Sequence, residues 1–427
     1  MAAGVGGVVS VLRAQSTKRA RAHNTQCPLL TLLSQSDDLR DALLTAQLQH
    51  YGLVTLWRLK AVSTQWRDWV HAAMRQLPAL LVQGQGQSCL FALSFEQMRW
   101  TALPRPTAVV GRQGHAVCST VSGEIVLAGG TVQTELPAAH PLGNRIDADT
   151  RSVEVYCGGV WRSTPAIGLP APLRRPSMLS LHDGSLLLLG GFGEGGVARA
   201  EVWRLRLRGS GHGGAGGCPA APSLWEGGTP MHTARSDFAC GVLPDGRVIV
   251  AGGLGNAPPD RPAHQQVMLQ SAEIYDPEAD RWSSLPAMRY PRSACRGCVD
   301  KLGRFIVSGG RGMQEGPLTV PLDAVECFVP VRELAQTVSP DGRQQGCWIE
   351  YGWAVETERQ SCGGPEEGQV APPPLPFRSV GHSMVCIAGD LIVVGPAFAS
   401  SNGGGAGSAR PSLSLSLSLS LSLSLSL

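Results

Sequence analysis

An apolar tetrapeptide followed by two glycines recurs along the middle of this 427-residue chain, and no other feature limits the possible folds so strongly. Four copies span residues 125–130, 186–191, 248–253 and 305–310, and a fifth copy at 391–396 has Pro396 as its last residue. A further glycine stands six residues before the first glycine of each copy: Gly123, Gly184, Gly246, Gly303 and Gly389. Repetition at intervals of about 60 residues predicts similar structural units placed side by side.

Each unit predicts a sheet of four antiparallel strands. A two-residue turn such as Asp245-Gly246 follows the first strand and supplies the positive φ angles of a tight hairpin. The second strand is apolar at almost every position, as expected when both of its faces are buried. Tyr275 and Trp282 flank an Asp-Pro turn, which predicts the third and fourth strands. Repeated four-stranded units of this kind predict a mainly β fold, the β-propeller.

The diglycine run, the Tyr-Asp-Pro…Trp stretch and the arginine before each first strand together resemble the Kelch repeat. The resemblance covers roughly residues 81–396 and implies a Kelch-type β-propeller. Residues 90–100 look like the last two strands of a blade, and residues 377–395 look like the first two. Pairing of these two segments would close a ring of about five four-stranded blades.

Residues 28–78 have apolar residues at three- and four-residue spacing, which predicts a small α-helical module. Val62-Ser63 and Trp66-Arg67 follow a leucine-rich stretch here, and the segment resembles the second half of an F-box. Members of that family dock such helices on the linker subunit of a cullin ubiquitin ligase. The resemblance assigns this contact to the following residues: Leu53, Leu56, Leu59, Val62 and Trp66.

A helical cap packed on the propeller is the alternative for this module. Residues 34–38 lack the Leu-Pro with which an F-box usually opens. A docking helix should expose its leucines, whereas a cap should bury them.

An F-box-like module before a Kelch ring implies a protein-interaction adaptor, the substrate-recognition subunit of an SCF-type ubiquitin ligase. The helices would bind the ligase linker, and the propeller face would bind an unknown target protein. A Kelch scaffold without a ligase is the alternative. A galactose oxidase-like copper enzyme is a third interpretation, but the chain has five tyrosines and no evident copper cluster. We therefore expect no catalytic residue, no metal site and no cofactor.

An arginine stands 17 residues before the first glycine of four copies, and 15 residues before it in the second copy. The strand order places these arginines at one mouth of the central channel. Guanidinium groups in a ring would suit an acidic or phosphorylated peptide, so the candidate target-binding residues are Arg112, Arg175, Arg235, Arg292 and Arg378. The alternative is that each arginine braces its own blade through backbone carbonyls.

Histidines and cysteines were considered as metal ligands. His115 and His382 occupy like positions in their repeats, which a shared strand position explains without a metal. Cys295 and Cys298 form a lone C-x-x-C, and a structural zinc site needs a second pair. Without a secretory signal, the twelve cysteines are expected as reduced thiols.

Charge and composition bear on partners and compartment. Lys and Arg total 36 against 33 Asp and Glu, so no basic footprint predicts binding to nucleic acid or to a membrane surface. No apolar run reaches the roughly 20 residues of a membrane span. The first 36 residues are basic, which indicates a disordered tail, with a transit peptide or a nuclear signal as alternatives. We expect a cytoplasmic or nuclear protein, with organelle targeting still open.

Four segments follow from these observations. Residues 1–27 form the basic tail or targeting segment, 28–78 the helical module, 79–396 the propeller and 397–427 a low-complexity tail. Residues 412–427 alternate Ser and Leu without interruption, a period that suits a strand. The run has one apolar face and no charge, which favours aggregation, and we assign it no function.

Overall fold

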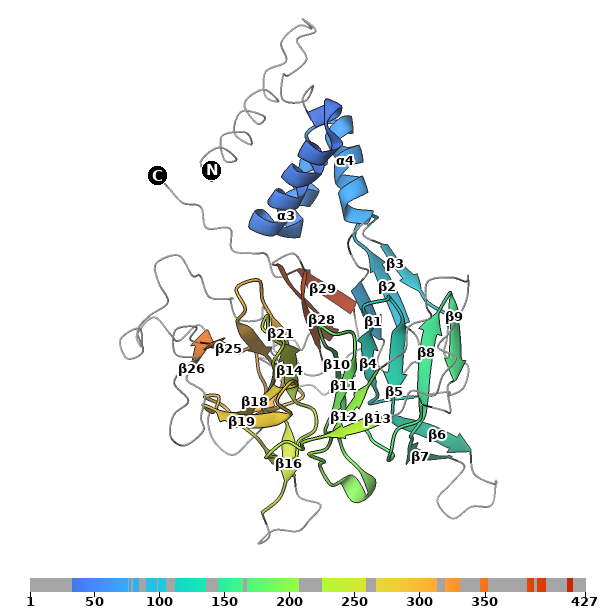
Figure 1. The fold of residues 1–427 in the computed structure, drawn as a ribbon, viewed down its shortest axis with the longest axis vertical. Coiled ribbons are helices and arrows are strands. Elements are labelled where there is room, and N and C mark those ends of the chain that lie inside the picture. Colours follow the sequence, from blue (N-terminus) through green and yellow to red (C-terminus); the bar gives the residue numbers. More distant parts are fainter. Residues whose placement is uncertain are drawn as a thin grey trace, which may run out of the picture.

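The computed structural model describes residues 33–75, 77, 80–83, 90–97, 99–104, 112–135, 145–163, 167–206, 225–258, 266–312, 319–330, 346–351, 382–387, 390–396 and 413–417. Antiparallel strands make up most of the structure, and helices α3 (Asp37–Leu59) and α4 (Thr64–Arg75) stand at one end of them (Figure 1). Within these ranges, no helix combines the length and the apolar character that a membrane crossing requires.

Four sheets have the four antiparallel strands that the repeat predicts, joined in chain order. Blade 1 contains β4 (Ala116–Ser119), β5 (Ile125–Ala128), β8 (Val153–Cys157) and β9 (Val160–Ser163). Blade 2 contains β10 (Ser177–Ser180), β11 (Leu186–Leu189), β12 (Val202–Leu205) and β13 (Trp225–Gly228). Blade 3 contains β14 (Ala239–Val242), β15 (Val248–Ala251), β18 (Ala272–Asp276) and β19 (Arg281–Leu285). Blade 4 contains β21 (Arg296–Val299), β22 (Phe305–Ser308), β25 (Val325–Pro330) and β26 (Gly346–Tyr351). The first strands of successive blades lie next to one another, so the mainly β propeller is confirmed.

The second strand of every one of these blades is buried at all four positions. Its side chains pack against the neighbouring blades on both sides. Leu187 and Leu189 of blade 2, for example, share one core with Phe238, Val248 and Val250 of blade 3. This burial on two faces explains the continuous apolar run before each diglycine.

The diglycine joins each blade to the next. The amide of Gly253 in blade 3 donates a hydrogen bond to the carbonyl of Arg292, which precedes blade 4, over 2.8 Å. Its φ of 103° lies in the left-handed region, and a Cβ atom there would stand 2.6 Å from the carbonyl oxygen of Ser236. Glycine alone satisfies both conditions without strain.

The connections between second and third strands project from one face, at the bottom of Figure 1, and we call it the loop face. Blade 1 has a hairpin there, of β6 (Thr131–Glu135) and β7 (Arg145–Asp149). Blade 3 has a hairpin of β16 (Leu254–Asn256) and β17 (Gln266–Met268). Blade 4 has β20 (Arg292–Ser293), β23 (Arg311–Gly312) and β24 (Val320–Pro321). Blade 2 has a short turn with the 3-10 helix η2 (Glu194–Gly196).

Two three-stranded sheets accompany the four blades. One contains β1 (Leu80–Gln83), β2 (Leu90–Ser94) and β3 (Arg99–Ala102). The other contains β27 (Ser383–Ile387), β28 (Asp390–Pro396) and β29 (Leu413–Leu417). The expected shared blade is therefore wrong for the described strands, because β28 pairs with β29 and not with β2. The alternating Ser-Leu run fits the two-residue period of a strand and occupies the free edge of β28.

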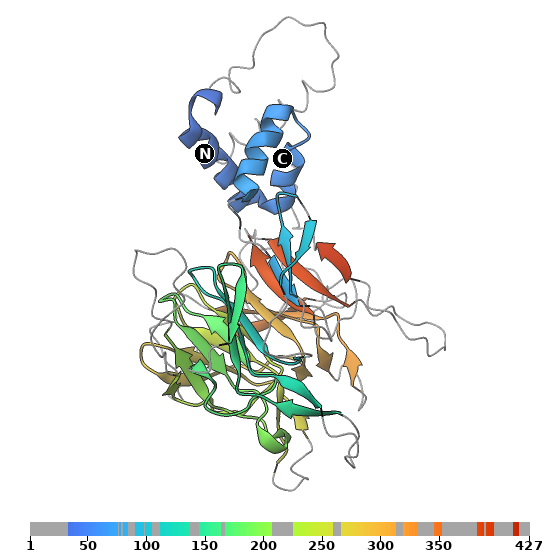
Figure 2. The same cartoon turned by 90° about the vertical axis from the view of Figure 1, so that its right-hand side faces the viewer.

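The helices and the first sheet share one hydrophobic core. It contains apolar residues of α3 and α4 together with Leu93 and Phe95 of the β2–β3 hairpin, and Val385 of β27 packs against it. His71 and Arg75 of α4 also lie 3.5 and 3.7 Å from the carboxylate of Glu96. Figure 2 shows the helical pair directly above β2, β3 and the C-terminal sheet.

Candidate interaction surfaces

Three of the five repeat arginines lie inside their blades: Arg112, Arg235 and Arg292. Arg235 donates through Nη1 to the carbonyl of Gly252 over 2.8 Å and through Nη2 to Oε1 of Glu273 over 2.6 Å. Burial lowers the pKa of Arg235, and the Glu273 carboxylate opposes this effect. A partner cannot reach these guanidinium groups, so the prediction that they bind a target is wrong. They brace their own blades, as in the alternative interpretation.

Each of these arginines has a glutamate partner that the sequence analysis missed. Glu154 lies 3.4 Å from Arg112, and Glu326 is paired with Arg292 in the same way. All three glutamates are buried on the third strand of their blade. Each stands two residues before an aromatic residue, and this repeated acidic position is the signal that could have identified them.

Blade 2 lacks this ion pair. Leu173 stands 17 residues before Gly190 and so occupies the position of the repeat arginine, and it is buried. Trp203 pairs with Leu188 across β11 and β12, in the register that Glu273 has in blade 3. An apolar pair thus replaces the charged pair, and Arg175 is not the equivalent of the other arginines.

Arg175 lies on the inner rim of the loop face, with 54% of its side chain exposed. Its φ of 52° is left-handed, and Asp237 of blade 3 has the same conformation at the equivalent position. Nη1 of Arg175 lies 2.5 Å from Oδ2 of Asp237, and its amide donates to the carbonyl of Gly114. Arg175 therefore stays a candidate target-binding residue, whereas Arg378 lies outside the described residues.

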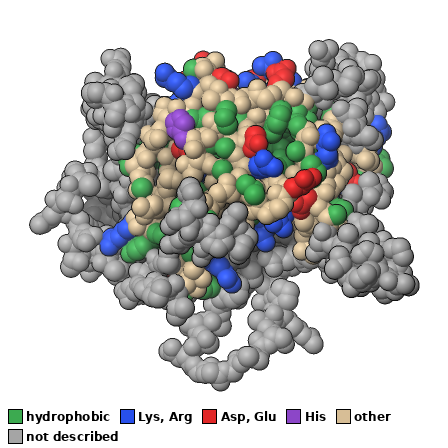
Figure 3. All heavy atoms as spheres, turned by 90° about the horizontal axis from the view of Figure 1, so that it is seen from below, with side chains coloured by type: hydrophobic (Ala, Val, Ile, Leu, Met, Phe, Trp, Pro, Cys, Tyr) green, Lys and Arg blue, Asp and Glu red, His purple; other side chains and the backbone are tan. Residues whose placement is uncertain are grey.

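Neighbouring loops are clasped together on this face. The side chain of Asn256 accepts from the amide of Ala198 over 2.7 Å and donates to the Ala198 carbonyl over 3.0 Å. Gln266 donates to the carbonyl of Gly196 over 3.3 Å. The β16–β17 hairpin is thus fixed to the turn of blade 2. Figure 3 shows charged side chains of both signs and apolar side chains mixed on this face.

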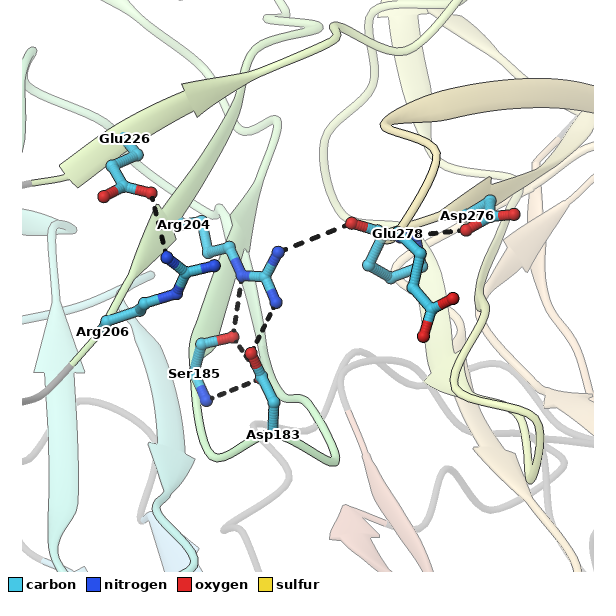
Figure 4. Close-up of polar contacts among 8 residues, drawn as sticks. Asp183, Ser185, Arg204, Arg206, Glu226, Asp276 and Glu278 are labelled. Atoms are coloured by element: carbon cyan, nitrogen blue, oxygen red, sulfur yellow. Dashed lines mark hydrogen bonds and ion pairs between the residues drawn. The ribbon is translucent and has the colours of Figure 1, made fainter.

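The opposite face carries the turns between first and second strands and between third and fourth strands. Arg204 of blade 2 lies 2.6 Å from Oδ2 of Asp183 and donates to Ser185 Oγ over 2.9 Å (Figure 4). It also reaches the carbonyl of Pro277 in blade 3, at 3.5 Å. Polar side chains here join adjacent blades.

Four of the five predicted docking residues of the helical module are buried: Leu53, Leu56, Leu59 and Trp66. They form the core that joins the helices to the β2–β3 hairpin. The prediction that they contact the linker directly is therefore wrong in this structure. Val62 follows the end of α3 and has 41% of its surface exposed, so it stays a candidate.

The two histidines of the repeat are buried and neutral at pH 7. Burial, and second the charge of Arg112, lowers the pKa of His115 to about 3. Burial, and second Arg296, lowers the pKa of His382 to about 3, and its Nε2 lies 2.7 Å from Ser308 Oγ. No group of three or more metal-ligating side chains occurs among the described residues.

Comparisons with known proteins agree with this architecture. The Kelch motif matches residues 234–289, which include most of blade 3. The F-box/kelch-repeat protein At2g44130 of Arabidopsis thaliana is 40% identical over 91 residues, which cover 21% of this chain and 20% of that protein. The F-box/kelch-repeat protein SKIP20 of the same plant is 33% identical over 155 residues, covering 31% of this chain and 34% of SKIP20.

More distant matches carry less detail. Human Kelch-like protein 33 is 31% identical over 153 residues, covering 36% of this chain and 24% of that protein. The chain thus matches between a fifth and about a third of the length of these relatives. The solved structure of YjhT superimposes with a TM-score of 0.50 at 11% identity, covering 74% of this chain and 86% of YjhT. This last similarity concerns the fold alone.

Proposed function

We propose that this chain, a Kelch-repeat protein of the F-box/kelch-repeat family, is the substrate-recognition subunit of an SCF-type ubiquitin ligase. The observation that carries the proposal is the helical pair built onto the propeller, in a chain whose relatives are named as F-box/kelch-repeat proteins. The chain itself would act as a non-catalytic adaptor in the cytoplasm or nucleus, and the partner subunits would perform the ubiquitin transfer.

The surface available to a ligase linker is the end of α3 and the turn that follows it. Lys60 lies with its Nζ 3.5 Å from the ring centre of Trp57, which is half-buried. Val62 adds an exposed apolar side chain two residues later. An apolar centre beside a cation is suited to a partner surface of mixed apolar and acidic character. The buried leucines would support this surface from beneath.

The shared core supports a fixed arrangement of the two binding surfaces. The leucines of α3 and the β2–β3 hairpin are packed together, and ion pairs from His71 and Arg75 to Glu96 add to that contact. A rigid adaptor of this kind would hold a target on the propeller at a constant distance from the linker.

A Kelch scaffold with a helical cap is the second candidate. The burial of Leu53, Leu56 and Leu59 favours it, because a cap is expected to bury its leucines. The two candidates differ in whether the exposed residues after α3 bind a linker subunit.

A pulldown of the full-length chain with the purified cullin-linker subunit tests the proposal. The wild type should bind, and Val62→Asp should abolish binding. Leu39→Asp is the matched control, because Leu39 is equally exposed but lies in the first turn of α3. Loss in the Leu39 variant alone would move the contact to that end of the helix. A folded wild-type chain that binds no linker would refute the ligase role and leave the scaffold.

A further inference from the structure

Positive charge occupies a different place in blade 2 than in the other blades. Blades 1, 3 and 4 carry a buried arginine at the repeat position, where blade 2 has Leu173. Blade 2 has arginines at the next two positions, Arg174 and Arg175, whereas blade 3 has Ser236 and Asp237 there. The guanidinium groups of blade 2 are therefore moved from the blade interior to the loop face.

Arg174 is held on the loop face with an unsatisfied donor. Its guanidinium lies 5.4 Å from the ring centre of Phe192, and the backbones of these two residues exchange hydrogen bonds of 2.9 and 2.7 Å. Its Nε is buried and has no hydrogen-bond partner. Arg174 also takes part in none of the ion pairs in the described part of the chain. A stacked, immobilised guanidinium loses little entropy when it binds an anion.

Two further arginines flank Arg174. Arg175 is more than half exposed on the inner side, and Arg199 is 40% exposed. Arg199 packs against Gly193, and its nearest carboxylate, Glu201, is at 3.7 Å. The short glycine-rich turn of blade 2 lies between the longer hairpins of blades 1 and 3, so this arginine cluster occupies a low part of the loop face.

Acidic residues near the cluster limit what it can bind. Asp149 and Glu194 both lie close enough to interact electrostatically, and burial raises the pKa of Asp149 while Arg174 opposes that rise. A run of several acidic residues would be repelled by these carboxylates. One anionic group, flanked by neutral or basic residues, fits the cluster better.

We propose that Arg174, Arg175 and Arg199 bind the carboxylate or phosphoryl group of a single acidic or phosphorylated residue in an extended segment of a target protein. Planar guanidinium groups match both anions with paired, charge-assisted hydrogen bonds. The inference rests on the proposed adaptor function, since it names the chemistry of the target, but binding of the anion does not require a ligase.

Arrays of peptides test the proposal with the full-length chain as the probe. Each peptide carries Gln, Glu, Ser or phosphoserine at one central position among mixed neutral and basic residues. The variants are Arg174→Gln, Arg199→Gln and the control Arg206→Gln. Arg206 is also exposed, at 60%, but follows the other end of β12, near Glu226 (Figure 4). Equal unfolding midpoints of the four chains would show that they are folded alike.

Wild type and Arg206→Gln should prefer Glu over Gln, or phosphoserine over Ser, by about tenfold. Arg174→Gln and Arg199→Gln should lose most of that preference. The Glu and phosphoserine arms tell which anion is bound. Absence of any preference in the wild type, or its persistence in Arg174→Gln, would overturn the assignment. Retained anion preference in a chain that binds no linker would refute the ligase role and leave this site standing.

Discussion

Removal of the cation from the buried pair Arg235–Glu273 should destabilise the propeller severely. Arg235→Met removes the donor to Glu273 and to the carbonyl of Gly252. Glu273 would stay buried with two remaining donors, the amides of His232 and Thr233 at 2.7 and 3.0 Å. Loss of one member of a buried ion pair typically costs about 3–5 kcal/mol. We expect a loss of that size in the free energy of unfolding.

The double variant Arg235→Met, Glu273→Leu should be less destabilised than the sum of the two single variants. Blade 2 has an apolar pair, Leu173 and Trp203, at the same two positions, so the fold accepts this exchange. Apolar replacement of a whole buried pair is often neutral. The carbonyl of Gly252 would still lose its donor, which leaves a residual cost of about 1–3 kcal/mol. The coupling energy between the two changes should therefore be at least about 2 kcal/mol.

Urea unfolding followed by tryptophan fluorescence measures these differences from the midpoints and slopes of the transitions. Arg247→Met is the matched control in the same blade, because its partner Asp245, at 2.7 Å, lies on an exposed turn. Surface pairs contribute about 0–1 kcal/mol. A cost of Arg235→Met no larger than that of the control would refute the bracing role. Strict additivity of the two single changes would do the same.

Other consequences can be measured on the same chain. The pKa of His115 and of His382 is depressed from 6.5 to about 3, so the stability that neutral burial supplies is complete above pH 6.5 and is lost as pH falls toward 3. Each histidine should contribute about 1.4 kcal/mol per pH unit in that window, and His382→Phe should reduce the slope of unfolding free energy against pH accordingly. Gly253→Ala should cost more than about 1 kcal/mol, because φ is positive and a carbonyl oxygen occupies the Cβ site, whereas Gly158→Ala has open space and should cost less in the same urea assay. Burial raises the pKa of Cys118 to about 12, so iodoacetamide at pH 8 should modify this thiol only after denaturation, as read by mass spectrometry; rapid labelling of the native chain would contradict its burial.

Much of the blade structure could be predicted from local pattern. The turn at Asp245-Gly246, the buried second strand at 248–251 and the pair Gly252-Gly253 all occur as expected. These features depend on φ angles and on alternation of side chains, which are properties of a few consecutive residues. The family resemblance agrees with the Kelch match and with the F-box/kelch-repeat relatives.

The candidate sites were predicted less well. The repetition of Arg112, Arg235 and Arg292 indicated a shared role, but their spacing does not tell whether a guanidinium faces the channel or a buried glutamate. The same offset rule led to Arg175 and passed over Arg174, because the rule searched for the residue type and Leu173 occupies the aligned position.

The order of strands within each blade therefore follows from sequence, since hairpins form between neighbouring segments of the chain. Burial of the α3 leucines beneath Leu93 and Phe95, and pairing of β28 with β29 in place of β2, depend on contacts between segments far apart in the chain. Several partners of similar pattern compete for such contacts. Only packing in three dimensions decides among them, and with that which side chains stay exposed to bind a partner.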